Sequence, residues 1–171
     1  MKTKIWAHRG ASAYAPENTL AAFMLAIEQK ADGIELDVHF TKDKVAIITH
    51  DDDVFRVTGY HGLVENLTLE EIKKLSFDNK MAAYFGEKAP TLEEVLDLIK
   101  PSNLTINIEL KTNHRRPEGL EEVCQELVKK AGMDERVLYS SFNHHSLNHI
   151  KKIAPHMPCG ILYSNNMFSV V

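Results

Sequence analysis

Short polar clusters interrupt the apolar runs of this sequence and supply the side chains that could carry out chemistry. They are His8 with Arg9, Glu35 with Asp37, His50 with Asp51, and Glu109 with Lys111. Charged groups are rarely buried unless they are paired, bound to a metal or used in function. Two histidines, three carboxylates, an arginine and a lysine at strand ends are typical of a metal-assisted site for a phosphate ester.

The carboxylates predict a cation site. Glu35 and Asp37 stand two residues apart, so on a strand both side chains project to the same side. Two adjacent carboxylates repel each other unless a cation lies between them, and Glu109 adds a third from another expected strand. Three carboxylates form an oxygen site that suits Mg²⁺ or Ca²⁺ better than zinc. The alternative is that all three are solvated charges at exposed strand ends.

The two histidines predict acid–base catalysis. Histidine is the side chain whose ordinary pKa lies near neutrality, and His8 and His50 each belong to one of the polar clusters. Beside a phosphodiester, one could take a proton from an attacking hydroxyl while the other gives a proton to the leaving alkoxide. Arg9 and Lys111 are natural partners for phosphoryl oxygens, although Lys111 could instead neutralise Glu109.

Phe142 ends a later expected strand at the same rim of the sheet. Its ring could form a wall of the site or belong to the ordinary core, and the sequence favours neither interpretation.

A hairpin is expected to bring these clusters together. Residues 34–40 alternate between apolar and polar side chains, which is typical of a strand, and 45–49 form a second strand after a short polar turn. So short a turn predicts an antiparallel pair, which places His50 beside Glu35 and Asp37.

The remaining segments predict strands that alternate with helices. Strands are expected over 5–7, 105–111, 137–142 and 159–163, and helices over 20–30, 92–99, 118–131 and 146–153. Residues 51–90 are expected to form an irregular insertion with one short helix. Capping boxes predict helix starts at Thr68 with Glu71 and at Thr91 with Glu94. This alternation predicts parallel α/β packing in a single domain, 1–171.

Composition limits the class of protein. The chain has 171 residues, of which 44% are hydrophobic and 26% charged, as in soluble globular proteins. Its net charge of −4 argues against nucleic-acid binding. Its apolar stretches fall short of the roughly 18 residues that span a bilayer, so no stable membrane insertion is expected. The first residues lack the pattern of a secretory signal, which favours a cytoplasmic location.

The polar clusters together resemble the glycerophosphodiester phosphodiesterase family. The matching motifs occur in the family's order and are His8-Arg9-Gly10, Pro16-Glu17-Asn18-Thr19, Glu35-Leu36-Asp37-Val38, Thr41-Lys42-Asp43, His50-Asp51, Asn107-Ile108-Glu109-Leu110-Lys111 and Ser141-Phe142. The resemblance implies a TIM (β/α)8 barrel with its site at the C-terminal rim of the strands. It also implies that 51–90 is the family's small extra segment after the second strand.

The same resemblance implies a role for each polar residue. A divalent metal, Mg²⁺ or Ca²⁺, would be held by Glu35, Asp37 and Glu109. Arg9 and Lys111 would bind phosphate, and His8 and His50 would form the acid–base pair.

The implied reaction releases glycerol 3-phosphate and an alcohol from a small glycerophosphodiester, through a cyclic phosphate that water then opens. By analogy with related phosphodiesterases, His8 is expected to act as the base and His50 as the acid.

Length is the departure from the family pattern. Barrel strands near residues 5, 34, 106, 138 and 160 make about five of the eight βα units expected, and a complete barrel has about 250 residues. The barrel is therefore expected to be incomplete at its C-terminal side, so a second copy of the chain could be needed to cover it.

Two alternative functions follow. One is a truncated, non-catalytic fragment that binds a metal or phosphate. The other is a sphingomyelinase-type phospholipase, which the missing secretory signal and disulfide pattern disfavour.

Overall fold

The protein is built on one sheet. The computed structural model describes residues 3–112 and 117–164. The strands are β1 (Trp6–His8), β2 (Gly33–Phe40), β3 (Ala46–Ile48), β4 (Thr105–Leu110), β5 (Val137–Ser141) and β6 (Cys159–Ile161). Five run parallel in the order β1-β2-β4-β5-β6, and β3 pairs antiparallel with β2. Within the described residues, this sheet extends from β1 to β6 without closing into a ring.

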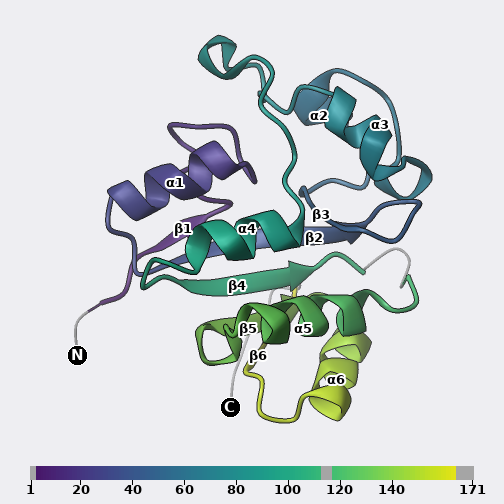
Figure 1. Cartoon of the computed structure of the whole chain (residues 1–171). Helices are drawn as coiled ribbons and strands as arrows, with labels where there is room; N and C mark the ends of the chain where they lie inside the picture. Colours follow the sequence, from purple (N-terminus) through teal and green to yellow (C-terminus); the bar gives the residue numbers. More distant parts are fainter. Residues whose placement is uncertain (1–2, 113–116, 165–171) are drawn as a thin grey trace.

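Four helices lie side by side on one face of the sheet, as Figure 1 shows. They are α1 (Leu20–Glu28), α4 (Leu92–Ile99), α5 (Leu120–Ala131) and α6 (His144–Ile153). Their apolar sides and alternate residues of the central strands, among them Leu36 and Ile108, form the main core. Strands in parallel order with helices on one face agree with the predicted barrel type. The expectation that the barrel is incomplete stays a prediction.

The opposite face of the central strands is polar. In β2 the apolar residues alternate with Glu35, Asp37 and His39, and in β4 with Asn107 and Glu109. Because successive side chains of a strand point to opposite faces, every one of these polar groups points away from the helices. The alternation of side chains along β2 and β4 therefore places apolar residues in the core and polar residues at the candidate site.

The predicted hairpin is confirmed, and its geometry is specific. β1 pairs with the first half of β2, through His8 and Glu35, whereas β3 pairs with the last part of β2, through Val38 and Ile48. The chain leaving β3 runs back along β2, where the backbone N–H of Thr49 donates to the Asp37 carbonyl at 3.1 Å. The ends of β1 and β3 therefore approach each other beside the middle of β2.

Residues 51–90 contain more structure than the sequence predicts. The expected single helix is α3 (Leu69–Lys74), but α2 (Phe55–Thr58) and two 3-10 turns, Val64–Asn66 and Ala82–Tyr84, are also present. The prediction of one short helix was wrong because α2 has only four residues and no side-chain cap, and ends at Gly59 with φ 76°. A second small core lies under this segment, formed by Ile47, Val54, Val57, Val64, Ile72, Phe77 and Ala89.

Helix starts agree well with the sequence. Both capping boxes are present, at Thr68 with Glu71 and at Thr91 with Glu94. Two helix starts shift by a turn or less: α5 begins at Leu120, and α6 begins at His144.

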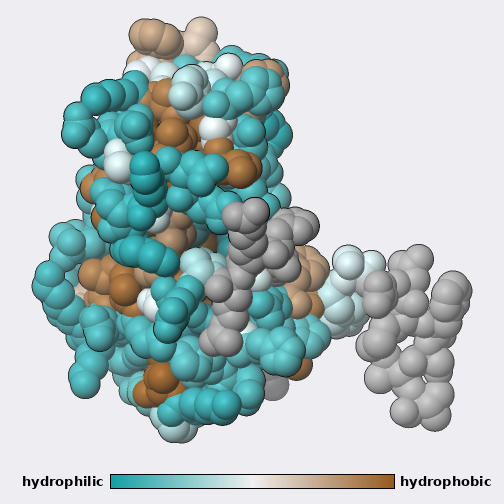
Figure 2. Space-filling view, turned by 90° about the vertical axis from the view of Figure 1, so that its right-hand side faces the viewer, coloured by the Kyte–Doolittle hydropathy of each residue, from teal (hydrophilic) through white to brown (hydrophobic). Residues whose placement is uncertain are grey.

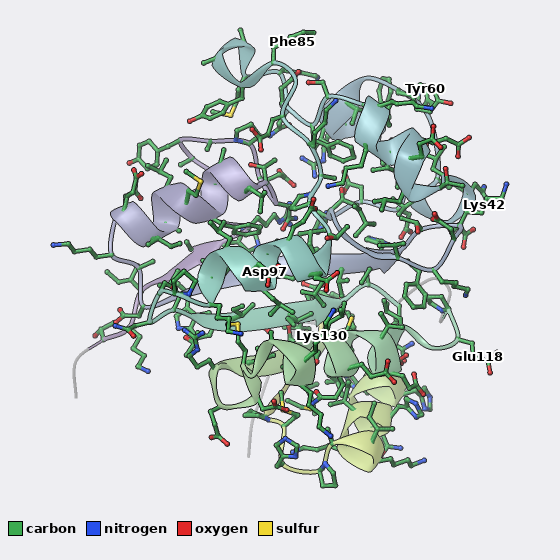
Figure 3. The ribbon with its side chains drawn as sticks, viewed as in Figure 1. Lys42, Tyr60, Phe85, Asp97, Glu118 and Lys130 are labelled. Atoms are coloured by element: carbon green, nitrogen blue, oxygen red, sulfur yellow. The ribbon has the colours of Figure 1, made fainter. Side chains whose placement is uncertain are left out.

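The surface is mostly hydrophilic on the side seen in Figure 2, with apolar patches between polar residues. Figure 3 shows Phe85 at the outer end of the 51–90 segment and Tyr60 near α2. Phe85 is 84% exposed. Among the helices in the described part of the chain, none combines the length and the apolar character needed to cross a bilayer.

Candidate active site

Three carboxylates meet on the polar face of the sheet. β2 and β4 are in register so that Asp37 lies opposite Glu109 and Glu35 lies opposite Asn107. One carboxylate oxygen from each of Glu35, Asp37 and Glu109 lies within 4.8 Å of the others, and all three residues are buried. Among the described residues, this is the one group of acidic, histidine or cysteine side chains arranged to hold a metal ion.

The charge on these carboxylates is not fully compensated by the protein. Burial, together with the neighbouring charges of Asp37 and Glu109, raises the pKa of Glu35 to about 8, because the backbone N–H and the charge of Arg9 offset only part of these effects. Two carboxylates in a low-dielectric site repel each other strongly unless one is protonated or a cation binds between them. The cluster therefore favours either a bound proton or a bound cation.

Several buried oxygens beside this cluster also lack hydrogen-bond partners. Within the described residues, no group donates a hydrogen bond to Glu35 Oε1, Asp37 Oδ1 or Asn107 Oδ1. Buried oxygen atoms normally have a partner, and unsatisfied ones indicate a missing water or ion. Carboxylate and amide oxygens are ligands that Mg²⁺ and Ca²⁺ prefer, so the residues present fit a divalent cation.

Asn18 holds the central carboxylate in place. Its Nδ2 donates to Asp37 Oδ2 at 2.8 Å, and its Oδ1 accepts from the Asp37 backbone N–H at 3.4 Å. Asn18 adopts φ 58°, a conformation that asparagine tolerates better than most residues. The sequence motif predicted a helix start here, and Thr19 does cap α1, but the contact of Asn18 with Asp37 was not foreseen.

The two cations predicted to bind phosphate are paired with these carboxylates. Lys111 Nζ lies 3.0 Å from Glu109 Oε1 and 3.5 Å from Asp37 Oδ1. Arg9 Nε lies 3.5 Å from Asp37 Oδ2, and Arg9 Nη1 donates to Glu17 Oε1 at 2.9 Å. Lys111 therefore does neutralise Glu109 here, as the alternative interpretation stated, and its phosphate-binding role stays a prediction.

His8 and His50 approach the cluster from the ends of β1 and β3. His8 Nε2 lies 3.8 Å from Glu35 Oε2, and 69% of its side chain is exposed. His50 is less exposed, at 30%, and its Nδ1 lies 2.7 Å from Asp51 Oδ1. Burial alone would raise the pKa of Asp51, but hydrogen bonds from Arg56 and His50 lower it, so Asp51 is ionised at neutral pH. An ionised carboxylate only accepts, so Nδ1 of His50 carries the hydrogen.

His39 contacts the backbone of His50. It lies on the polar face of β2, is 6% exposed, and its Nε2 donates to the His50 carbonyl at 3.2 Å. Burial lowers the pKa of His39, so its ring is neutral. A cavity of about 140 Å³ opens beside His39 and extends to Lys111 and Leu63.

Phe142 lies at the end of β5 and is 42% exposed. The interpretation that it belongs to the core was wrong, because the strand ends one residue earlier and leaves its ring in solvent. Its role as a wall of the site stays a prediction.

Comparison with known proteins identifies the family. A model of the glycerophosphoryl diester phosphodiesterase family matches residues 8–167. The chain belongs to this family.

Individual relatives agree with the family match. A glycerophosphodiester phosphodiesterase from Caldanaerobacter subterraneus subsp. tengcongensis is 49% identical over 95% of this chain and 68% of its own length. One from Bacillus altitudinis is 43% identical over 94% of this chain and 66% of its own length. A phosphodiesterase from Oleispira antarctica, solved with the product sn-glycerol-3-phosphate, has a TM-score of 0.87 at 35% identity, covering 98% of this chain and 68% of that one. The chain spans about two thirds of the length of these relatives.

The sequence did not indicate the contacts of three residues in this member of the glycerophosphodiester phosphodiesterase family. Asn18 and Glu17 were noted only as members of a family motif, without a contact or a role, and Arg56 was not noted at all. The available signal was the charged Glu17 beside Asn18 in a matching family motif. For Arg56 the nearby Asp51, five residues earlier, was a local signal, whereas its partner Glu17 is 39 residues away and leaves none.

Proposed function

We propose that this protein hydrolyses small glycerophosphodiesters to glycerol 3-phosphate and an alcohol, with a divalent cation held by Glu35, Asp37 and Glu109. The observation that carries the proposal is the buried three-carboxylate cluster, in which Glu35 Oε1 and Asp37 Oδ1 accept no hydrogen bond from the described residues. A bound Mg²⁺ or Ca²⁺ would supply positive charge for the phosphoryl oxygens as negative charge develops on them.

The two histidines would divide the proton transfers. His8, neutral and open to solvent, would take the proton of the glycerol hydroxyl next to the phosphodiester, and the freed oxygen would attack phosphorus. His50, protonated, would give its Nε2 proton to the departing alcohol oxygen, and a cyclic phosphate would remain. In the second half, His50 would take a proton from water as the water attacks phosphorus. His8 would then return its proton to the ring oxygen that leaves.

The surroundings of His50 support its part in this scheme. A histidine that acts as an acid must carry a proton, and the ionised Asp51 at 2.7 Å stabilises the imidazolium. The same contact holds Nδ1 and leaves Nε2 as the ring nitrogen that can reach a substrate.

Arg9 and Lys111 would receive the phosphate. Both border the carboxylate cluster, and Lys111 is 11% exposed, so its ammonium is partly shielded from water. A bound cation would compensate the negative charge of the carboxylates. The phosphodiester group of the substrate would then be an anionic partner for both Arg9 and Lys111.

The name of one structural relative agrees with the proposed product. The Oleispira antarctica phosphodiesterase was solved with sn-glycerol-3-phosphate, and it shares 35% identity with this chain. The alternative of a sphingomyelinase-type enzyme has no such support, and Cys124 and Cys159 are both free thiols here.

Hydrolysis of glycerophosphocholine tests the proposal. Release of glycerol 3-phosphate should stop with EDTA and return when Mg²⁺ or Ca²⁺ is added. The ion that restores more activity is the one that the site prefers. Glu109→Gln should abolish turnover because it removes a charged ligand. Glu93→Gln is the matched control, since Glu93 pairs with Lys130 on the helix face and should keep full activity.

Turnover that survives EDTA, or that survives in the Glu109→Gln variant, would contradict the proposal. Cation binding without any turnover by the folded protein would support a non-catalytic binding protein instead.

A further inference from the structure

Arg56, an arginine outside the predicted site, connects the end of β1, where His8 lies, with the end of β3, where His50 lies. Arg56 belongs to α2, in the 51–90 segment. Its Nε donates to Asp51 Oδ2 at 2.5 Å, and its Nη1 and Nη2 donate to the two oxygens of Glu17 at 2.9 and 2.7 Å. One guanidinium therefore binds two carboxylates at once, and it binds one of them with a fork of two hydrogen bonds.

Each of these carboxylates holds a residue of the proposed reaction. Asp51 Oδ1 accepts from His50 Nδ1 at 2.7 Å, on the chain that leaves β3. Glu17 Oε1 accepts from Arg9 Nη1 at 2.9 Å, next to the end of β1. Arg56 thus connects the proposed acid with the proposed phosphate-binding arginine through one carboxylate on each side.

The charges in this chain of contacts alternate in sign and reinforce each other. Burial of Glu17, whose side chain is 13% exposed, would raise its pKa, but hydrogen bonds from Arg56 and Arg9 lower it. Glu17 and Asp51 are therefore both ionised, and each accepts from a cation or an imidazole on one side and from Arg56 on the other.

Only arginine can make this connection. Its planar guanidinium carries five donors in fixed directions, so it can grip Glu17 with two and still reach Asp51 with a third. A lysine at this position keeps the charge but has no fork, so it cannot hold both carboxylates in fixed orientations.

We propose that Arg56 is a positioning residue for the reaction. It holds Asp51 against His50 and Glu17 against Arg9, and so fixes the distance and orientation between the proton donor and the phosphate. This inference rests on the proposed function, but it concerns a residue that touches neither the carboxylate cluster nor either histidine directly.

The competing explanation is that Arg56 only anchors α2. An anchor would affect stability, and its loss would leave the His50 ring unchanged. A positioning residue would affect the hydrogen on His50 Nδ1 and the rate of the chemical step. The two explanations therefore differ in measurements other than stability.

The test compares Arg56→Ala and Arg56→Lys with Arg136→Ala as a matched control. Arg136 also uses its guanidinium structurally, donating to the carbonyls of Ser102 and Lys100, away from the site. We expect kcat for glycerophosphocholine to fall about 100-fold in Arg56→Ala, the scale of a misplaced catalytic group, with a much smaller change in KM. Added guanidinium should restore part of kcat in that variant. Arg136→Ala should lose stability and keep kcat.

Nitrogen-15 NMR of the His50 ring provides a readout that needs no turnover. At a pH at which the His50 ring is neutral, the wild type should show the Nδ1–H tautomer, and Arg56→Ala should show a mixture of both tautomers. A wild-type kcat in Arg56→Ala, or a loss of kcat with an unchanged His50 ring and no rescue, would overturn the proposal.

If Arg56→Ala does not fold, Arg56→Lys decides, because it keeps the charge and should still lose at least about 10-fold in kcat. If the wild-type protein itself shows no turnover, the proposed function fails, while the tautomer measurement still tests the role of Arg56.

Discussion

The ends of β1 and β3 present the same kind of side chain in two different surroundings. His8, at the end of β1, is 69% exposed, and its nearest described carboxylate is Glu35 at 3.8 Å. His50, after β3, is 30% exposed, is bound to Asp51 at 2.7 Å, and has its backbone carbonyl held by His39. One histidine is free to turn, and the other is fixed at both its ring and its backbone.

This difference corresponds to different tasks. A general acid must keep a proton and present it in one direction, and a carboxylate at Nδ1 does both. A general base must start each cycle neutral, and His8 has no carboxylate as close as Asp51 is to His50 to stabilise its charged form. The assignment of His50 as acid and His8 as base, made from the sequence by analogy, stays a prediction, and this contrast between the two ends is the reason to test it.

The largest effect should come from replacing each histidine and varying the leaving group. His8→Ala and His50→Ala should each lower kcat for glycerophosphocholine by about 10²- to 10⁴-fold, since each removes a proton transfer. An aryl leaving group needs no proton, so His50→Ala should recover most of its rate on a glycerophosphoryl aryl ester. His8→Ala should stay slow on both substrates, and steady-state kinetics of the four combinations gives the answer.

Equal recovery of both variants on the aryl ester would remove the distinction between the two ends. Recovery of His8→Ala alone would reverse the roles of the two histidines.

A second prediction concerns Asp51, which lies 2.7 Å from the His50 ring, whereas the Glu35 carboxylate lies 3.8 Å from the His8 ring. Asp51→Asn should lower kcat by about 10- to 100-fold, because an amide oxygen no longer stabilises the imidazolium and the contact with Arg56 weakens. Asp78→Asn is the matched control, since Asp78 lies in the same segment and bonds Ser76 and the Lys80 backbone. A kcat for Asp51→Asn equal to that of Asp78→Asn would show that His50 needs no fixed orientation.

A third prediction uses the pH dependence of stability at the His8 end. The pKa of Glu35 is raised to about 8, above its ordinary value, with Asp37, Glu109, Arg9 and the nearby His8 as the charged or titratable groups around it. The folded protein without cation therefore holds a proton that the unfolded chain releases. Its free energy of unfolding should fall as pH rises from about 5 through about 8 and should level off once Glu35 is ionised in the folded protein as well.

A divalent cation should replace this proton and remove the loss of stability. Thermal unfolding with EDTA and with Mg²⁺ should show a larger rise in Tm at about pH 9 than at about pH 6. In Glu35→Gln both the pH slope and its response to Mg²⁺ should shrink. An equal rise in Tm at both pH values would mean that Glu35 does not compete between proton and cation.

Some features of the fold and of the candidate site were predictable from the sequence. The hairpin and the capping boxes at Thr68 and Thr91 were predictable because their signals lie within a few residues of one another. The meeting of Glu35, Asp37 and Glu109 was predictable because strand alternation decides which face a side chain occupies.

The contacts that orient these residues were not predictable in the same way. Arg56 lies in a four-residue helix without a side-chain cap, and Asn18 needs a positive φ to reach Asp37. The contacts of Arg56 with Glu17 and of Asn18 with Asp37 join residues 39 and 19 positions apart, so no local pattern of spacing identifies these two contacts. Sequence therefore predicts which side chains meet at the candidate site better than it predicts which side chains hold them in place.

The smallest effect should come from Ser12, whose side chain contacts the backbone of His8 and not the His8 ring. Ser12 Oγ donates to the His8 carbonyl at 2.8 Å, in an exposed position. Ser12→Ala should lower the free energy of unfolding by about 1 kcal/mol or less, as for one exposed hydrogen bond, and leave kcat unchanged. Denaturant unfolding and kinetics on the same samples measure both. If kcat instead fell as far as in Asp51→Asn, His8 would depend on a fixed orientation as much as His50 does, and the contrast between the two ends would disappear.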